Sequence, residues 1–238
     1  MAAWPGACCA CPNRSSTATD PVTFATGVLL ASVALGILYG AAFCWRPHSL
    51  LKLIVKTGST ALLALWAYLL GGPVLLVAGL ALSSLGDFFL EADENDKFLL
   101  PGMGAFFAAH VAYIVLFWAL PQAGRTLLIL AAQIGLIACG VVFIRWLAPW
   151  VTKDMRLPVI GYGGIILTMG AAALRLDPAY LPVLLGALMF IASDVILSFQ
   201  LFVRSADAPK RALPSIALWF LYYGGQALIA WGVLSNLA

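Results

Sequence analysis

Charged side chains are scarce in this chain. Of its 238 residues, only 10% are Asp, Glu, Lys or Arg, whereas 63% are hydrophobic. A soluble domain carries about 25% charged residues, most of them at its surface. The shortage of charge therefore excludes an ordinary water-soluble fold and predicts that much of the surface faces lipid.

Short alternating strands, which a membrane β-barrel would need, are also lacking. The apolar runs are instead long and continuous, close to the roughly 20 residues that cross a bilayer core. Without water, the backbone groups of such runs must bond internally, which favours helices. We predict an all-α, polytopic bundle of eight transmembrane helices. The predicted spans are Phe24–Cys44, Leu50–Leu70, Pro73–Leu90, Phe98–Leu120, Thr126–Leu147, Leu157–Leu174, Leu181–Val203 and Ser215–Leu237.

No stretch between the spans is long enough to form a separate soluble domain. We expect residues 23–238 to form one transmembrane domain and residues 1–22 to form a disordered N-terminal tail. Cys8, Cys9 and Cys11 crowd this tail, where they could be acylated or bind a metal. No second ligand pair lies at a suitable spacing, so spare thiols are the favoured interpretation. The tail also lacks the apolar segment and cleavage site of a signal peptide, so the first span is expected to be retained.

Basic residues are distributed unevenly between the two ends of the predicted bundle. Arg14, Arg125 and Arg175 lie on the side that holds both termini. The opposite side has Arg46, Lys52, Lys56, Lys97, Arg145, Lys153, Arg156, Arg204, Lys210 and Arg211. The positive-inside rule predicts that this second side faces the cytoplasm and that both termini are exoplasmic or lumenal. The expected membrane is the bacterial inner membrane or the endoplasmic reticulum.

One short pattern occurs twice. Gly86-Asp87-Phe-Phe-Leu90 lies in the third span, and Ser193-Asp194-Val-Ile-Leu197 lies in the seventh. An even number of spans separates the two, so both helices should run in the same direction. A duplicated four-helix unit would explain the repetition, and so would a chance match of so short a pattern.

Ionisable side chains inside the spans are few, and each is costly in lipid. They are Lys56, Asp87, His110 and Asp194. Lys52 and Glu91 lie nearer the predicted cytoplasmic boundary, and we expect their charges to reach water. Neither Asp has a basic residue three or four positions away, so any neutralising partner must come from another helix. Two carboxyls that share a low-dielectric site do not easily both ionise, which would leave one neutral acid and one carboxylate for general acid–base chemistry. The alternative is that each Asp only hydrogen-bonds to a neighbouring helix.

Further polar groups accompany these residues within the spans. Tyr113 follows His110 at helical spacing, Tyr162 lies near the start of the sixth span, and Tyr222, Tyr223 and Gln226 share one face of the eighth. The Tyr side chains could instead be interfacial anchors, an interpretation that does not suit the deeper Gln226. His48 and His110 are the only histidines and lack a metal-site spacing, so no metal or cofactor is expected.

In these segments the chain resembles the lysoplasmalogenases, also called YhhN-like proteins. The matching segments are Ser84–Leu90, Gly104–Tyr113, Gly186–Asp194 and Tyr222–Gln226. Their order and spacing suit the family along nearly all of the chain after the first twenty residues. Lys56-Thr57 stands where the family's second helix has Lys-Pro.

The resemblance implies a membrane hydrolase that cleaves the vinyl ether bond of lysoplasmalogens. The products would be a fatty aldehyde and glycerophosphoethanolamine or glycerophosphocholine. Asp87 and Asp194 would act as general acid and base. The substrate-binding or orienting residues would be Lys56, His110, Tyr113, Tyr162, Tyr223 and Gln226. The expected partner is a lysophospholipid within the bilayer, and no nucleic acid is expected.

Three other functions are compatible with parts of this pattern. Two buried carboxyls in a duplicated bundle also suit a proton-coupled transporter, although matching broken helices are not evident in the two halves. An intramembrane aspartyl protease also uses two Asp residues, but its Gly-x-Gly-Asp motif is replaced here by Ser84-Leu-Gly-Asp87. A structural or lipid-binding protein is the third alternative.

Overall fold

The computed structural model describes residues 21–92, 97–204 and 211–237, and in this part of the chain every predicted span is helical. Within these described ranges, eight helices are long and apolar enough to cross a membrane. The predicted all-α, polytopic bundle is therefore confirmed, and the chain is an integral membrane protein. Cys8, Cys9 and Cys11, for which acylation or metal binding was considered, lie outside the described residues.

The helices follow the predicted spans closely. Their bounds are α1 Pro21–Leu38, α2 Leu50–Leu69, α3 Val74–Ala92, α4 Leu99–Ala119, α5 Leu127–Leu147, α6 Lys153–Ala173, α7 Leu181–Ser198 and α8 Ala212–Leu234. Two π-helical turns, η1 Tyr39–Phe43 and η4 Phe199–Val203, extend α1 and α7. Two short 3₁₀ turns also occur: η2 Ala148–Trp150 follows α5, and η3 Pro178–Tyr180 precedes α7. The largest difference is at α6, which begins at Lys153 rather than Leu157. Hydropathy marks only the apolar part of this helix, whereas Asp154 in its first turn suits the helix dipole.

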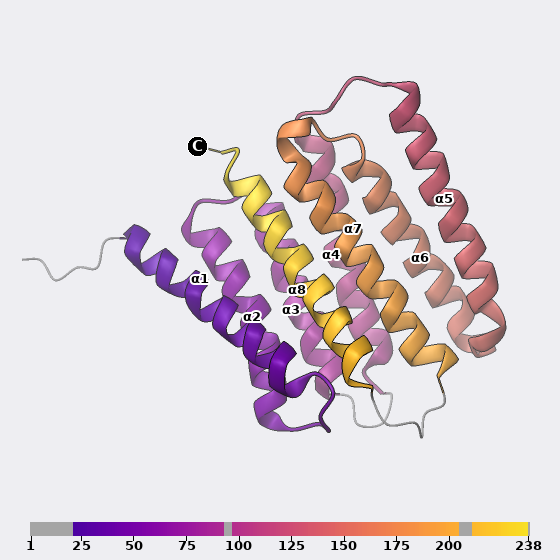
Figure 1. The fold of residues 1–238 in the computed structure, drawn as a ribbon, viewed down its shortest axis with the longest axis horizontal. Helices are drawn as coiled ribbons and strands as arrows, with labels where there is room; N and C mark the ends of the chain where they lie inside the picture. The colour runs from indigo at the N-terminus through magenta and orange to yellow at the C-terminus, as the bar shows by residue number, and fades with distance from the viewer. Residues whose placement is uncertain (1–20, 93–96, 205–210, 238) are drawn as a thin grey trace, which may run out of the picture.

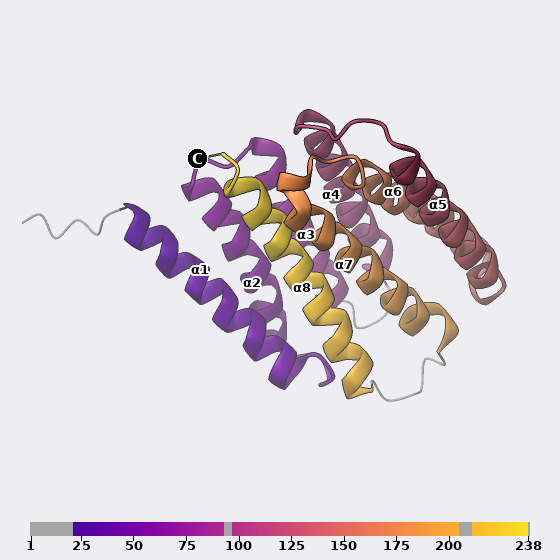
Figure 2. The same cartoon turned by 45° about the horizontal axis from the view of Figure 1, so that its top comes forward.

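Successive long helices run up and down through the bundle (Figures 1 and 2). α7 packs along α8, α3 packs along α4, and α2 lies against both α1 and α3. The C-terminal ends of α1, α5 and α7 lie at the lower end in Figure 1, and the C-terminus lies at the other end. We call the lower end the basic end, because it contains most of the Lys and Arg residues.

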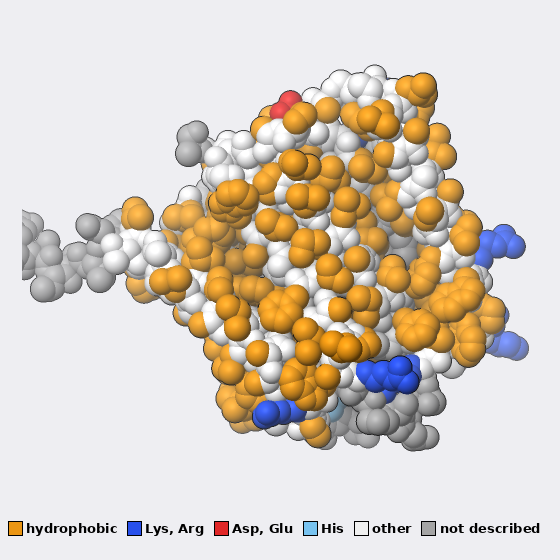
Figure 3. Space-filling model, viewed as in Figure 1, with side chains coloured by type: hydrophobic (Ala, Val, Ile, Leu, Met, Phe, Trp, Pro, Cys, Tyr) orange, Lys and Arg blue, Asp and Glu red, His pale blue; other side chains and the backbone are white. Residues whose placement is uncertain are grey.

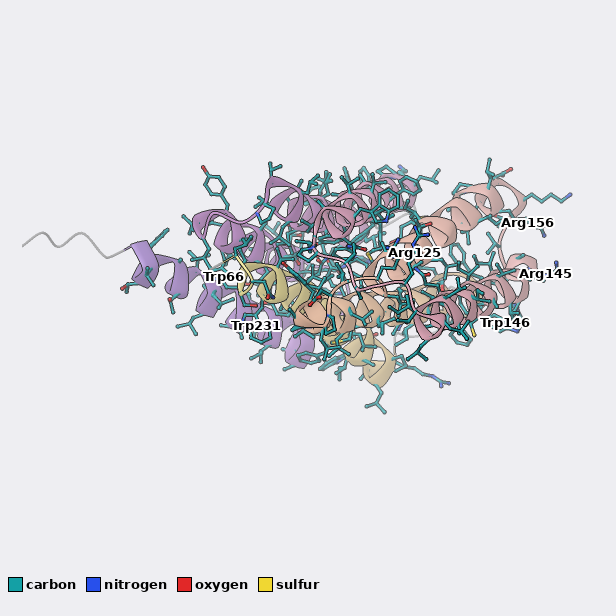
Figure 4. All side chains as sticks on the ribbon, turned by 90° about the horizontal axis from the view of Figure 1, so that it is seen from above. Trp66, Arg125, Arg145, Trp146, Arg156 and Trp231 are labelled. Carbon is teal, nitrogen blue, oxygen red and sulfur yellow. The ribbon has the colours of Figure 1, made fainter. Side chains whose placement is uncertain are left out.

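The surface matches a protein that is surrounded by lipid. Hydrophobic side chains cover most of the face in Figure 3, and the Lys and Arg side chains gather at its lower and right-hand margins. Seen from above in Figure 4, Arg145 and Arg156 lie at the outer edge formed by α5 and α6. α5 packs mainly on α6, and Leu147 is its only buried residue. The outer face of α5 is therefore expected to contact lipid.

Close backbone packing sets the position of α8 against α7. A methyl group added to Gly186 would lie 2.5 Å from the carbonyl oxygen of Gly225, so neither position has room for a side chain. Small residues at such crossings let two transmembrane helices approach closely. This contact brings the aromatic face of α8, which includes Tyr222, towards Phe190 of α7.

Candidate active site

Asp87 lies on α3 and is 2% exposed. Thr60 of α2 donates a hydrogen bond to its Oδ2 at 2.9 Å, and Tyr222 of α8 donates to the same oxygen at 2.6 Å. Lys56 of α2 brings its Nζ to 3.7 Å from Oδ1. We call these four residues the Asp87 cluster. Two hydroxyl donors and an ammonium are typical surroundings of a carboxylate.

Helical periodicity explains how α2 supplies two members of this cluster. Lys56 and Thr60 are four residues apart, so they lie on one face of α2, and that face is turned towards α3. This face of α2 is turned towards the core, so Thr60 is fully buried and the Lys56 side chain is mostly buried. The cluster therefore lies between three packed helices.

Lys52 and Glu91 extend the polar network towards the basic end. Lys52 is 0% exposed, and its Nζ lies 2.9 Å from Glu91 Oε1 and donates to the carbonyl oxygen of Arg46 at 2.9 Å. Glu91 is 5% exposed and accepts a hydrogen bond from the Tyr39 hydroxyl at 3.1 Å. The expectation that the charges of Lys52 and Glu91 reach water is therefore wrong. The π-helical end of α1 and the turn after it supply these partners and cover the pair, which hydropathy alone does not reveal.

Asp194 lies on α7 in different surroundings. Its Oδ2 is 3.7 Å from Nε2 of His110 on α4, and neither atom has a hydrogen-bond partner in the described part of the chain. Tyr162 on α6 lies beside the Asp194 carboxyl, and both residues line the same cavity. A distance of 3.7 Å is too long for a hydrogen bond, but a water molecule beside both atoms could bond to each of them. Asp194 and His110 therefore form a polar pair whose two facing atoms both have unused hydrogen-bonding capacity.

The tautomer of His110 follows from its backbone contact. Nδ1 lies 2.6 Å from the carbonyl oxygen of Phe106, and a carbonyl oxygen only accepts hydrogen bonds. Nδ1 must therefore carry a proton. In the neutral imidazole, Nε2 then has a free lone pair and can accept a proton from water or from a carboxylic acid.

A largely apolar cavity of about 290 Å³ lies beside Asp194. Its walls come mainly from α4, α5, α6 and α7 and include Met103, Phe106, Leu136, Phe143, Ile166 and Leu201. Asp194, Tyr162 and Ser198 also line it, and they supply one carboxyl and two hydroxyls to a mainly hydrophobic surface. We call this cavity the Asp194 pocket. It is suited to a single hydrocarbon chain whose reactive group lies against the carboxyl.

Aromatic rings separate the Asp87 cluster from the Asp194 pocket. The ring of Phe106 lines the pocket and packs edge-on against Tyr222, with centroids 5.8 Å apart. Phe190 packs against Tyr222 at 5.4 Å and against His110 at 4.7 Å. No hydrogen bond joins Asp87 to Asp194 among the contacts of the described residues. The two carboxyls thus belong to neighbouring sites on either side of one aromatic wall.

The other predicted residues are divided between this region and its surroundings. Tyr113 donates a hydrogen bond to Gln226, and both are fully buried. The Tyr223 hydroxyl instead lies 2.7 Å from Ser32 Oγ on α1. Two residues that contact Asp87 were not among the predicted site residues. The sequence pattern did not single out Thr60, whose only signal was its spacing from Lys56. Tyr222 was noted on the polar face of the eighth span and in the segment that resembles the family, but Tyr223 was chosen as the binding residue.

In residues 21–92, 97–204 and 211–237, no group of three His, Cys, Asp or Glu residues is arranged to hold a metal ion. The polar groups around Asp87 and Asp194 in this part of the chain are carboxyls, hydroxyls, lysines and one buried imidazole.

The fold and the site define a polytopic membrane protein. Its described part has eight membrane-crossing helices and two carboxyl sites, one buried at Asp87 and one mostly buried at Asp194. The model of the YhhN family matches residues 51–233, and the chain belongs to this family. Lysoplasmalogenases from Mycobacterium bovis and Mycobacterium tuberculosis are each 28% identical to it over 219 residues, and the match covers 87% of this chain and 79% of theirs. No solved structure matches the chain significantly.

Proposed function

We propose that this protein hydrolyses the vinyl ether bond of lysoplasmalogens, releasing a fatty aldehyde and glycerophosphoethanolamine or glycerophosphocholine. Membership of the YhhN family and the similarity to two mycobacterial lysoplasmalogenases support this activity. The single observation that carries the proposal is the Asp194 carboxyl in the wall of an apolar cavity. A single-chain lipid would place its hydrocarbon there.

Acid hydrolysis of a vinyl ether begins with protonation of a carbon atom. A proton adds to the β-carbon, the electron pair of the double bond forms the new C–H bond, and the α-carbon becomes an oxocarbenium ion. Water then attacks the α-carbon and loses a proton, and the resulting hemiacetal collapses to aldehyde and alcohol. The reaction needs a proton donor, a positioned water molecule and a group that accepts the water's proton.

Asp194 is the proposed proton donor. It lies in the cavity wall and has no Lys or Arg among its contacts in the described residues, which favours its neutral, protonated form in apolar surroundings. After it gives its proton to carbon, the carboxylate would stabilise the oxocarbenium ion in the same cavity, as carboxylates do in glycoside hydrolysis. Tyr162 is proposed to hold the carboxyl in its orientation.

His110 is the proposed ligand of the attacking water. Because its Nδ1 donates to the Phe106 carbonyl, its Nε2 is available to accept a hydrogen bond from a water molecule that also contacts Asp194. The water's proton would pass to this Nε2 or to the Asp194 carboxylate. Transfer to the Asp194 carboxylate restores the starting protonation state directly, whereas transfer to Nε2 restores it once the imidazolium passes this proton on to Asp194.

Asp87 is proposed as the anionic member of the carboxyl pair. Its two hydroxyl donors and Lys56 suit a permanent carboxylate, and the wall formed by Phe106 and Phe190 lies between it and the pocket. Its role would be to stabilise developing positive charge through a medium of low dielectric constant. Tyr113 and Gln226 are proposed to support the neighbouring core, and the basic end is proposed to face the cytoplasm.

Purified protein in vesicles without an ion gradient tests the activity. Lysoplasmalogen should yield free aldehyde, whereas the analogue with a saturated ether should remain intact, because it has no double bond to protonate. His110→Gln should release aldehyde more slowly by a factor of about 10². Absence of aldehyde from the vinyl ether substrate would contradict the proposal, and movement of protons or lipid without hydrolysis would instead favour a transporter.

A further inference from the structure

Glu91 occupies the centre of a buried charge network at the basic end. It lies four residues after Asp87 on α3, so both carboxylates lie on the same face of one helix. Its side chain is 4% exposed, and it contacts the ammonium groups of both Lys52 and Lys56. The proposed reaction does not use Glu91, and the hydropathy pattern gives no sign that it is buried.

The two carboxylate oxygens of Glu91 face different partners. Oε1 lies 2.9 Å from Lys52 Nζ and 3.4 Å from His48 Nδ1. Oε2 lies 3.5 Å from Lys56 Nζ and accepts a hydrogen bond from the Tyr39 hydroxyl at 3.1 Å. One oxygen therefore compensates the buried charge of Lys52, while the other is directed towards Lys56.

Lys56 is shared between two carboxylates. Its Nζ lies 3.5 Å from Glu91 Oε2 and 3.7 Å from Asp87 Oδ1, and both distances exceed those of a short, charge-assisted hydrogen bond. Removal of one attraction would allow the flexible ammonium to move towards the other carboxylate. The position of the positive charge beside Asp87 therefore depends on Glu91.

We propose that Glu91 is a positioning residue, which holds Lys56 between the two carboxylates and thereby fixes the positive charge that faces Asp87. This role rests on the proposed hydrolase function, because its expected consequence is a change in the rate of aldehyde release. Glu91 acts through Lys56 and is not among the residues that line the Asp194 pocket, where the substrate is proposed to bind. A simpler role would be to neutralise Lys52 alone, since an unpaired buried charge is strongly destabilising.

A pair of variants separates the two roles. Glu91→Gln leaves Lys52 without its counter-charge, whereas the double variant Lys52→Met with Glu91→Gln removes both charges of that pair. If Glu91 positions Lys56, the double variant should recover thermal stability but retain a kcat about tenfold below that of the wild type, with little change in KM. Lys52→Met alone, the matched control, keeps Glu91 beside Lys56 and should have a kcat within about twofold of the wild type.

Tyr39→Phe provides a second measurement that does not alter any charge. It removes only the hydroxyl that holds Oε2, the oxygen that faces Lys56, and leaves the contact between Lys52 and Oε1 in place. Its kcat should fall about threefold without a change in KM. This variant keeps the hypothesis testable even if the double variant does not fold.

The outcomes distinguish this inference from the function on which it rests. Aldehyde release by the wild type, together with an unchanged kcat in the folded double variant or in Tyr39→Phe, would overturn the positioning role alone. An equal loss of kcat in Lys52→Met and in the double variant would also overturn it, because Glu91 would then act only through Lys52. A wild-type protein that releases no aldehyde would refute the hydrolase function and this role with it.

Discussion

Asp87 and Asp194 stand in short, similar sequence patterns but in contrasting surroundings. Asp87 accepts two hydrogen bonds and faces a lysine between α2, α3 and α8. Asp194 lines an apolar cavity, and its Oδ2 faces an imidazole nitrogen that also has no hydrogen-bond partner in the described residues. A carboxylate whose oxygens already have hydrogen-bond and charged partners is suited to hold a fixed charge. A carboxyl with an oxygen that lacks a hydrogen-bond partner is suited to exchange a proton. The surroundings therefore suggest different roles for two residues that the sequence presents as equivalent.

The largest expected effect is that of Asp194→Asn on activity. An amide cannot supply the proton, so aldehyde release should fall by a factor of about 10³ or more. Thermal stability should change little, because Asp194 makes no described contact with a Lys or Arg. Aldehyde assays and melting curves in detergent measure the two quantities. A variant with wild-type activity would contradict the assignment of Asp194 as the acid.

Asp87→Asn should differ by lowering both activity and stability. It removes a charge that compensates Lys56 and weakens two hydrogen bonds from hydroxyl groups, at a cost of about 2 kcal/mol in the free energy of unfolding. The melting temperature should fall more than in Asp194→Asn. Equal melting temperatures for the two variants would contradict the claim that Asp87 contributes more to stability than Asp194 does.

Two adjacent tyrosines test the limits of the Asp87 cluster. Tyr222→Phe removes a hydrogen bond to the Asp87 carboxylate and should lower kcat about tenfold. Tyr223→Phe is the matched control, because this hydroxyl contacts Ser32 on α1, and its kcat should stay within about twofold of the wild type. The reverse order of effects would show that Tyr223, which the sequence pattern favoured, is the functional residue.

The smallest expected effect concerns the pocket wall. Cys139 of α5 lines the Asp194 pocket, whereas Ala138 beside it is exposed and is not a lining residue. Cys139→Trp should raise KM about threefold to tenfold by occupying space that the hydrocarbon chain needs, and Ala138→Trp should leave it unchanged. Steady-state assays with substrates of different chain length provide the measurement. Equal KM values in both variants would show that the hydrocarbon chain of the substrate does not bind in the Asp194 pocket.

Most of the fold was predictable from the sequence because lipid imposes strong constraints on a chain. Long apolar runs had to become helices, so the eight spans could be located within a few residues. The candidate residues were predictable for the same reason: in a chain so poor in charge, Asp87, His110 and Asp194 are conspicuous within the spans.

The partners of these residues were not predictable, because they depend on how the helices rotate and pack. Tyr222 and Tyr223 are adjacent, and only the packing of α8 decides which hydroxyl meets Asp87. Lys52 and Glu91 appear interfacial by hydropathy, yet the end of α1 and the following turn cover them. The Asp194 pocket could not be recognised either, since its apolar lining residues resemble those that face lipid or fill the core.

Single-turnover hydrolysis in H₂O and D₂O tests the central claim most directly. If the Asp194 carboxyl donates its proton to carbon, aldehyde should form more slowly in D₂O, and trapped aldehyde should carry deuterium on the carbon next to the carbonyl. Asp194→Asn should form no aldehyde within the same interval. Equal rates in the two solvents, together with aldehyde formation by Asp194→Asn at the wild-type rate, would contradict the account.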